Sequence, residues 1–316
     1  MSGGTTTTGA ADALASGGVA ARPSTPLPAV GSRRLRWAQT RAAFALEARK
    51  LLTGGSGVAL ALFGGLPVAL VTCWVIVANV LISRQIRSGN VDGDFANLAD
   101  ATVVFAALFR GFALAMIVFF ACMMVFVNLV RRELRDRSLH YYFLAPVRRE
   151  VVLAGKYAAG VAATFLVLGL SVGLSHLLIY LPFLRVARNE VERFFLAGPG
   201  FAHLAGYLGI TLLATIGYGA VFLALSVHVK NPVLPALAVY GWEWLHFLMP
   251  PMLKKLSVIH YLGALVPVPV DEGPFALVGE QPPAWLALGG LLAFSAVLLA
   301  LTMRRVRRME VVYGED

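Results

Sequence analysis

Charge is scarce in this sequence. Only 14% of its 316 residues are Asp, Glu, Lys or Arg, whereas 58% are hydrophobic and the mean hydropathy is +0.74. An ordinary soluble domain has about 25% charged and about 45–50% apolar residues. The shortage excludes a disordered chain, a nucleic-acid-binding module and most soluble enzymes. The apolar residues occur as long runs rather than as the periodic stripes of soluble helices, which indicates an integral membrane protein.

Cysteine is almost absent as well. The two cysteines, Cys73 and Cys122, both lie inside apolar runs. They cannot form a framework of disulfides, and the CxxC spacing of metal sites does not occur. We interpret both as small buried hydrophobic residues.

Six apolar runs are long enough to cross a membrane. A span needs about 20 apolar residues, because the hydrocarbon core is about 30 Å thick and a helix rises about 1.5 Å per residue. The runs are 58–83, 111–130, 157–181, 201–229, 232–253 and 284–303. They predict an all-α integral membrane protein with six transmembrane helices.

Most of the 27 Lys and Arg residues fall on one side of this predicted topology. They cluster before residue 51, between 131 and 156, and from 304 to 308, with Lys230 between the fourth and fifth runs. The cytoplasmic side of a membrane protein carries such an excess of cations. The net charge of +10 is therefore explained by an excess of Lys and Arg in the cytoplasmic segments. We predict a cytoplasmic-membrane protein with both termini in the cytoplasm.

The N-terminal region divides into two parts. Residues 1–32 are mostly Gly, Ala, Ser, Thr and Pro, which predicts a disordered cytoplasmic tail. In 33–52, Trp37, Phe44 and Leu51 recur every seven residues and share one face of a helix. We predict an interfacial amphipathic helix on the cytoplasmic leaflet, and a plain extension of the first span remains the alternative.

The connection between the second and third runs is long and unusual in composition. Residues 131–156 are densely charged, yet they also contain Leu139, Tyr141, Tyr142, Phe143 and Leu144. Charges mixed with aromatic side chains on a cytoplasmic loop are typical of a docking surface for a soluble partner. An amphipathic turn packed on the membrane surface is the other interpretation, and the loop alone does not decide between them.

The same segment contains short motifs in a definite order. They are Glu133, Ser138-Leu139, Tyr142-Phe143-Leu144, Pro146, Arg148-Arg149 and Gly155-Lys156. This order resembles that of the ABC-2 type transporter permeases, whose loop has a Glu, then Thr or Ser followed by Leu, a hydrophobic patch, a Pro, basic residues and a Gly-Lys entering the next span. Ser138 stands where Thr is commoner, and it keeps the hydroxyl. The resemblance covers residues 33–308, so that 53–308 is expected to be a six-span permease domain and 309–316 a cytoplasmic C-terminal tail.

The resemblance implies a mechanism. In such transporters this loop forms a cytoplasmic coupling helix that sits in a cleft of a separate ATPase subunit. ATP binding brings two ATPase copies together, and the coupling helices turn that closure into movement of the spans. For this chain it implies that the ATPase contact is formed by Glu133, Ser138, Leu139, Tyr142, Phe143, Leu144 and Pro146.

The chain itself carries no sequence signature for ATP hydrolysis. Gly155-Lys156 is followed by Tyr157, so that no GxxxxGK[ST] phosphate loop is present, and no LSGGQ-type signature occurs. We therefore expect no enzyme activity and no cofactor bound by this chain, with ATP-Mg held by the ATPase partner. The resemblance also implies a homodimer or a heterodimer with a second permease, surrounded by membrane lipids, with export as the usual direction. No nucleic-acid partner is expected.

Glu243 is an acidic residue well inside a predicted span. His246 follows three residues later, so both side chains can share a helical face. A carboxylate inside the membrane is costly and is a candidate functional residue. The alternatives are a structural hydrogen bond to a neighbouring span or to the loop that follows, and a direct role with substrate or protons.

Two other function classes stay open: an ion-coupled secondary transporter, and a haem- or metal-bearing membrane anchor or membrane enzyme. His176, His203 and His246 fall in the outer half of the predicted membrane, with His260 in the next loop. They could ligate a metal or a haem, or form separate hydrogen bonds. The proline-rich segment 254–283 is expected to be broken or re-entrant.

Two short motifs have more ordinary explanations. Residues 169–173 fit the GxSxG nucleophile elbow, but that elbow needs a strand-to-helix turn, and this copy lies in an apolar span. Helix packing by small residues explains it better. Asp92-Gly93-Asp94 places two carboxylates on an outer loop, where solvation is the simpler explanation than a metal site.

Overall fold

The structure is a computed structural model, and it describes residues 33–88, 98–135, 149–245, 248–270 and 282–307. Several predictions fall outside these residues. They concern the tails 1–32 and 309–316, the segment 136–148, Asp92-Gly93-Asp94 and His246. By internal contacts the chain divides into two compact units, residues 1–38 and residues 39–316.

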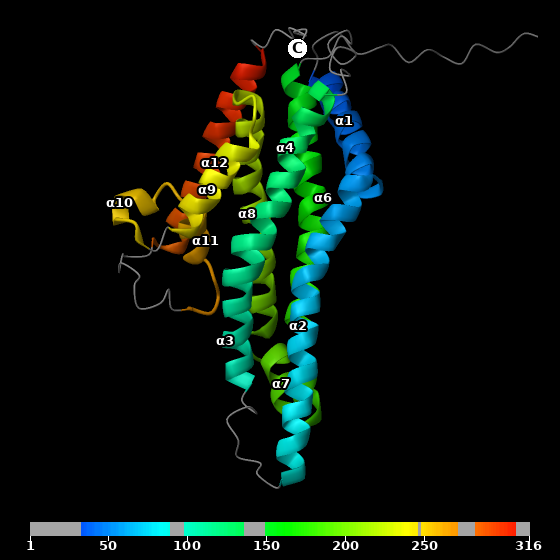
Figure 1. Cartoon of the computed structure of the whole chain (residues 1–316), viewed down its shortest axis with the longest axis vertical. Coiled ribbons are helices and arrows are strands. Elements are labelled where there is room, and N and C mark those ends of the chain that lie inside the picture. The colour runs from blue at the N-terminus through cyan, green and yellow to red at the C-terminus, as the bar shows by residue number, and fades with distance from the viewer. Residues whose placement is uncertain (1–32, 89–97, 136–148, 246–247, 271–281, 308–316) are drawn as a thin grey trace, which may run out of the picture. The chain divides into compact units, whose positions relative to one another are not determined.

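Every regular element in the described residues is a helix, which confirms the all-α prediction. In chain order they are α1 (Arg33–Thr53), α2 (Gly55–Ser88), α3 (Leu98–Leu108), η2 (Phe109–Val118), α4 (Phe119–Arg135), α6 (Arg149–Leu178), η3 (Leu181–Arg185), α7 (Arg188–Leu196), α8 (Gly200–His228), α9 (Val233–Trp244), α10 (Pro251–Lys254), α11 (Val258–Gly263) and α12 (Ala284–Arg307). Within the second unit the long helices run alongside one another (Figure 1).

Five helical stretches among the described residues are long and apolar enough to cross a membrane. They are Gly55–Arg84, Leu98–Arg132, Arg149–Arg185, Gly200–His228 and Ala284–Arg307. These stretches contain all or most of the first, second, third, fourth and sixth predicted runs. They indicate a multi-pass membrane protein.

The fifth predicted run, 232–253, contains a much shorter helix. α9 has 12 residues, which rise about 18 Å and fall short of a hydrocarbon core of about 30 Å. Pro250 is extended, and Pro251 begins the separate four-residue turn α10, because a proline does not continue a helix from the preceding residues. The six-span count therefore stays a prediction.

Part of the proline-rich segment that follows lies against α8. A Cβ placed on Gly217 of α8 would come within 3.1 Å of Val258, and one placed on Gly206 would come within 2.6 Å of Pro267. Residues 258–267 thus lie at the depth of the span rather than beyond its end. The prediction of a broken or re-entrant segment within 254–283 stays a prediction.

The second span is interrupted by a wide helix. α3, η2 and α4 follow one another directly, and η2 is a ten-residue π-helix. The sequence predicted a span beginning at residue 111, whereas the helical stretch already begins at Leu98. Arg110 lies inside it, and its Nη1 donates a hydrogen bond to the carbonyl of Val270 at 2.7 Å. This bond ties the π-helix to the segment that follows α11.

The core is centred on α8, which packs against α4, α6 and α12. Aromatic rings fill much of it: the ring of Phe119 lies 5.2 Å from that of Tyr218 and 5.0 Å from that of Phe222, centroid to centroid. Gly219 leaves room for Phe126, since a Cβ there would come within 2.6 Å of the Phe126 ring. The small residues of the fourth run therefore let α4 and α8 approach closely.

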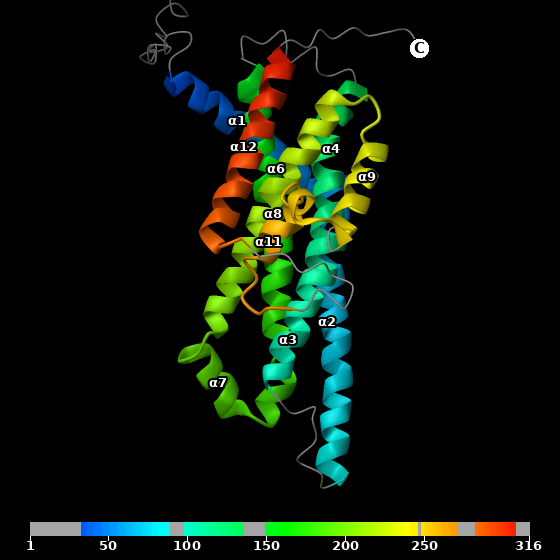
Figure 2. The ribbon, with the colours of Figure 1, turned by 90° about the vertical axis from the view of Figure 1, so that its left-hand side faces the viewer.

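α1 and α2 are separate helices joined at Gly54. The amide of Gly54 donates to the carbonyl of Lys50 and closes α1. Figure 2 shows α1 meeting α2 at an angle instead of continuing its axis. The helix predicted for 33–52 is thus present, and its placement on the membrane surface stays a prediction.

Candidate functional site

The predicted ATPase contact lies almost entirely outside the described residues. The structure places Glu133 in the last turn of α4 without describing its side chain, and Ser138, Leu139, Tyr142, Phe143, Leu144 and Pro146 fall in the segment 136–148. The coupling helix therefore stays a prediction. The helices on either side of the segment are described: α4 ends at Arg135 and α6 begins at Arg149.

The beginning of α6 is fastened to α1 by a buried ion pair. The ammonium of Lys156 lies 3.7 Å from the carboxylate of Glu47, and each side chain is 5% exposed. Gly155 makes this approach possible, because a Cβ there would come within 2.9 Å of both the Cβ of Ala43 and the carbonyl of Thr40. The sequence pattern of 33–52 does not identify this pair, because its two residues are far apart in the chain.

A groove opens beside this ion pair. It has a volume of about 620 Å³ including its open side, and it is lined by Gln39, Ala42, Ala43, Leu46, Glu47, Val152 and Lys156. Its walls are mostly apolar, and both charged residues of the pair line it. α1 and α6 thus meet around a pair of opposite charges.

A second ion pair joins the same end of α6 to α12. Arg307 Nε donates to Glu150 Oε2, and the side chains are 62% and 20% exposed. A pair this exposed contributes little to stability. Its position is informative nonetheless, because the first two turns of α6 contact both α1 and α12 through charged side chains.

Glu243 is buried, 5% exposed, and its carboxylate accepts hydrogen bonds from at least four donors. Oε1 accepts the amide of Val258 at 2.8 Å. Oε2 accepts the amide of Ile259 at 2.9 Å, the hydroxyl of Ser257 at 2.8 Å and the hydroxyl of Tyr218 at 3.3 Å. The carboxylate thus caps the first amides of α11 from a different helix.

These contacts match the structural alternative for Glu243, which called for bonds to a neighbouring span or to the loop that follows. Tyr218 belongs to α8, and Ser257 precedes α11. A carboxylate held by these donors is oriented by the fold, and a role of Glu243 with substrate or protons stays a prediction. His246, the predicted companion of Glu243, lies outside the described residues.

The described histidines lie in different surroundings. The ring of His176 packs among those of Phe105, Tyr180 and Tyr207, at centroid distances of 4.8, 5.3 and 5.5 Å. His203 lies against Phe194, and His260 against Tyr261. Within the described part of the chain, no three His, Cys, Asp or Glu side chains come together in a way that could hold a metal ion. The described histidines therefore do not form one cluster, and the metal-bearing alternative stays untested.

The GxSxG match lies inside α6, where it joins two spans. The hydroxyl of Ser171 donates to the carbonyl of Gly64 in α2. A Cβ on Gly64 would come within 2.9 Å of Val167, so that α2 and α6 lie close together at this point. The motif forms no strand-to-helix turn, and its serine serves helix packing.

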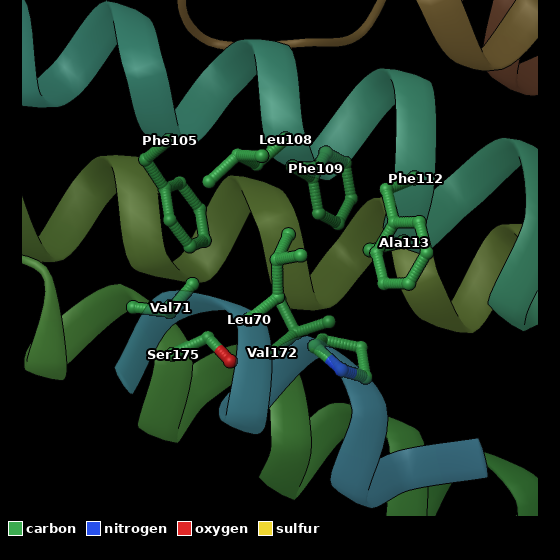
Figure 3. Close-up of a pocket in the computed structure, with 10 residues that line it drawn as sticks. Leu70, Val71, Phe105, Leu108, Phe109, Phe112, Ala113, Val172 and Ser175 are labelled. Atoms are coloured by element: carbon green, nitrogen blue, oxygen red, sulfur yellow. The ribbon is translucent and has the colours of Figure 1, made fainter. Parts of the chain in front are cut away.

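A narrow groove lies between α2, the second span and α6. Figure 3 shows Phe105, Leu108 and Phe109 on the side of the second span, facing Leu70, Val71, Val172 and Ser175. The groove is lined by Pro67, Leu70, Val71, Phe105, Leu108, Phe109, Phe112, Ala113, Val172 and Ser175. Sequence reasoning did not identify it. Pro67 inside an apolar run was the one visible signal, since the π-helix leaves no comparable trace in the sequence.

Several buried hydroxyl groups near this groove make no hydrogen bond within the described residues. They include the hydroxyls of Ser175, Tyr180 and Tyr207, whose residues are each 2% exposed or less. Buried polar groups are nearly always hydrogen-bonded.

No protein-family model matches this chain, and no curated protein matches it either. The family resemblance accordingly rests on the motifs of residues 131–156 and on the helical architecture.

Proposed function

We propose that this chain is the membrane-spanning permease subunit of an ATP-driven transporter of ABC-2 type. In this proposal it moves substrate across the cytoplasmic membrane, in the direction of export, using ATP hydrolysed by a separate ATPase subunit. The ordered motif set of residues 131–156 supports it, as do the five long apolar helices. The alternatives of an ion-coupled transporter and a haem- or metal-bearing anchor find no comparable support.

The observation that carries the proposal is the way α6 begins. The segment 136–148 leads directly into α6. Lys156 is paired with Glu47 of α1, and Glu150 with Arg307 of α12. A displacement of this segment would thus act on α6 directly, and on α1 and α12 through the two ion pairs in the first two turns of α6. This is the arrangement that a coupling element needs.

The energy required is modest. A segment that contacts the ATPase differently in its open and closed states shifts the spans by its difference in affinity for the two. A shift from 1:99 to 99:1 takes about 5.5 kcal/mol. Two ATPase copies, each contacting one permease of a homodimer or heterodimer, divide that requirement between two contacts.

Within the proposal, the remaining features follow the resemblance. The permease has six spans with both termini in the cytoplasm, and α9 is the core of the fifth. ATP-Mg is bound by the ATPase partner and not by this chain. Glu133, Ser138, Leu139, Tyr142, Phe143, Leu144 and Pro146 form or support the contact with the ATPase.

Alanine substitution of the aromatic cluster tests the proposal. A buried aromatic anchor at an interface typically contributes about 2 kcal/mol or more, and rim charges contribute less. Phe143→Ala should therefore weaken ATPase co-purification in mild detergent by about tenfold or more, or uncouple ATP hydrolysis from transport in reconstituted membranes. Arg148→Ala, the matched control in the same segment, should have a much smaller effect. If Phe143→Ala, Leu139→Ala and Tyr142→Ala all leave both measurements unchanged, the coupling assignment is wrong.

A further inference from the structure

The groove between α1 and α6, beside Glu47 and Lys156, has room for a small molecular group. The part of it that a ligand can occupy is about 230 Å³. A cavity of about 150 Å³ in another protein is large enough to bind benzene. On that scale the groove admits a group of about nine non-hydrogen atoms. It is open on one side, so that such a group can be part of a longer molecule.

Most of the wall of this groove is apolar. Ala42, Ala43 and Leu46 line it from α1, and Val152 lines it from α6. Leu46 is 56% exposed, so that the groove is reached from the outer surface of α1. Water gains little from such a wall, whereas methylene groups pack against it favourably. An occupant with a short apolar part therefore fits better than water alone.

The carboxylate of Glu47 needs more donors than Lys156 provides. The two charged groups are 3.7 Å apart, whereas a charge-assisted N–H···O bond measures about 2.7–2.9 Å. Within the described residues no hydrogen bond to Glu47 supplements this ion pair. A buried ion pair is favourable only when further hydrogen bonds satisfy its remaining lone pairs. Because Glu47 lines the groove, an occupant of the groove can supply those donors.

The groove lies near the ends of the apolar helices. The apolar stretch of α6 begins at Arg149, and Lys156 follows in its second turn. The apolar stretch of α12 ends at Arg307, which pairs with Glu150 in the first turn of α6. Charged residues at the ends of apolar helices mark the boundary between membrane and water, where lipid headgroups lie. Phospholipid headgroups are therefore the groups that surround the groove at the highest concentration.

The charges in the groove favour a zwitterionic headgroup. A lone cation or anion would meet a like charge at either Lys156 or Glu47, whereas a zwitterion can meet an opposite charge at both. A primary ammonium carries three N–H donors for the carboxylate, and a quaternary ammonium carries none. The methylene groups between an ammonium and a phosphate suit the apolar wall.

We propose that this groove binds the headgroup of a phospholipid whose phosphate bears a primary ammonium, as in phosphatidylethanolamine. The ammonium donates hydrogen bonds to Glu47, and the phosphate lies beside Lys156. The methylene groups between them contact Leu46 and Val152, and the acyl chains stay in the bilayer. The bound lipid thus joins α1 to α6. This binding does not depend on the proposed transport function.

Lipid competition measured by native mass spectrometry tests the proposal. The chain is purified in mild detergent and titrated with phosphatidylethanolamine, its N,N-dimethyl derivative, phosphatidylcholine and phosphatidylglycerol, all with the same acyl chains. The first phosphatidylethanolamine should bind about tenfold more tightly than phosphatidylcholine, because charge-assisted hydrogen bonds are lost when the ammonium is fully methylated. The dimethyl derivative, which keeps one N–H donor, should bind with intermediate affinity.

Two variants place this preference in the groove. Glu47→Gln/Lys156→Met removes both charges, and Ala42→Trp fills the groove from an exposed position while both charges remain. Each should bring the affinity for phosphatidylethanolamine down to that for phosphatidylcholine. Because the two variants alter the chain differently, loss of the preference in both cannot be ascribed to one damaged fold.

A matched control and three outcomes decide the matter. Glu192 of α7 is an exposed carboxylate that is also paired with a cation, Arg188 at 2.8 Å, and Glu192→Gln should leave the preference unchanged. Equal binding of phosphatidylethanolamine and phosphatidylcholine would overturn the proposal and leave the groove to water. Tightest binding of phosphatidylglycerol would overturn the zwitterionic class. A preference that persists in both groove variants would place the headgroup elsewhere. The titration contains no ATPase, so that its outcome and that of the co-purification experiment are independent.

Discussion

Two buried carboxylates, Glu47 and Glu243, are accommodated in different ways. They are 4% and 5% exposed. Glu47, near the beginning of α6, has a cation at 3.7 Å. Glu243, against the middle of α8, accepts two backbone amides and two hydroxyls. The first arrangement relies on the charge of one long, adjustable side chain. The second relies on several short, fixed dipoles.

The difference teaches what each site can tolerate. A Lys side chain can follow a moving partner, so the Glu47–Lys156 pair can persist while α1 and α6 shift. The amides of Val258 and Ile259 are fixed by α11, so Glu243 holds α9 and α11 in one geometry. The end of the bundle where α6 begins is thus joined by an adjustable side chain, and the contact against the middle of α8 is joined rigidly.

The largest effect is expected where fixed donors lose their acceptor. Glu243→Leu leaves two buried amides and the hydroxyl of Ser257 without a partner, each at a cost of about 1–3 kcal/mol. We expect a loss of about 3 kcal/mol or more in unfolding free energy, measured by denaturant titration in detergent micelles. A loss below about 1 kcal/mol would show that the carboxylate does not hold α11.

Removal of the adjustable partner should have a smaller effect. Lys156→Met leaves the carboxylate of Glu47 buried and unpaired, which costs about 3–5 kcal/mol for a fully enclosed pair. We expect about 2 kcal/mol, because this pair lies beside an open groove and its distance is long. The double variant Glu47→Gln/Lys156→Met should recover at least half of the loss. Additive losses in this double-mutant cycle would contradict the pair.

The conservative change at Glu243 should have the smallest effect. In Glu243→Gln the amide oxygen can still accept the bonds of Ser257 and Ile259, while the new amino group faces the amide of Val258. One hydrogen bond is lost, a cost of about 1 kcal/mol, and most transport should be retained in reconstituted membranes. Complete loss of transport in a stably folded protein would favour a proton or substrate role instead.

The long apolar helices could be predicted from the sequence, because a membrane span requires an uninterrupted apolar run of about 20 residues. The runs 58–83 and 284–303 correspond closely to α2 and α12. The fifth run could not be resolved in this way. Hydropathy counts apolar residues from 232 to 253 alike, whereas the helix ends near Leu245 and the chain turns at Pro250.

The residues of the candidate sites were only partly predictable. Glu243 was identified because a carboxylate in an apolar run is conspicuous, yet its partners Ser257 and Val258 lie 14 and 15 positions away. Glu47 and Lys156 come together only through tertiary packing. Ser175 gave no signal at all, because an unpartnered hydroxyl is recognisable only once its surroundings are known.

The π-helix of the second span is shorter than an α-helix of the same ten residues would be. A π turn takes up more residues than an α turn, so the same ten residues wound as an α-helix would form a longer rod. Conversion of η2 would push α3 away from α4 and rotate one against the other, with the chain still helical throughout. Phe105 and Phe119, at opposite ends of this stretch, contact Tyr207 and Tyr218 of the same helix. Such a conversion would therefore combine a translation with a rotation of α3 relative to α4. It would shift the Phe105–Tyr207 contact along α8 while the Phe119–Tyr218 contact stays in place.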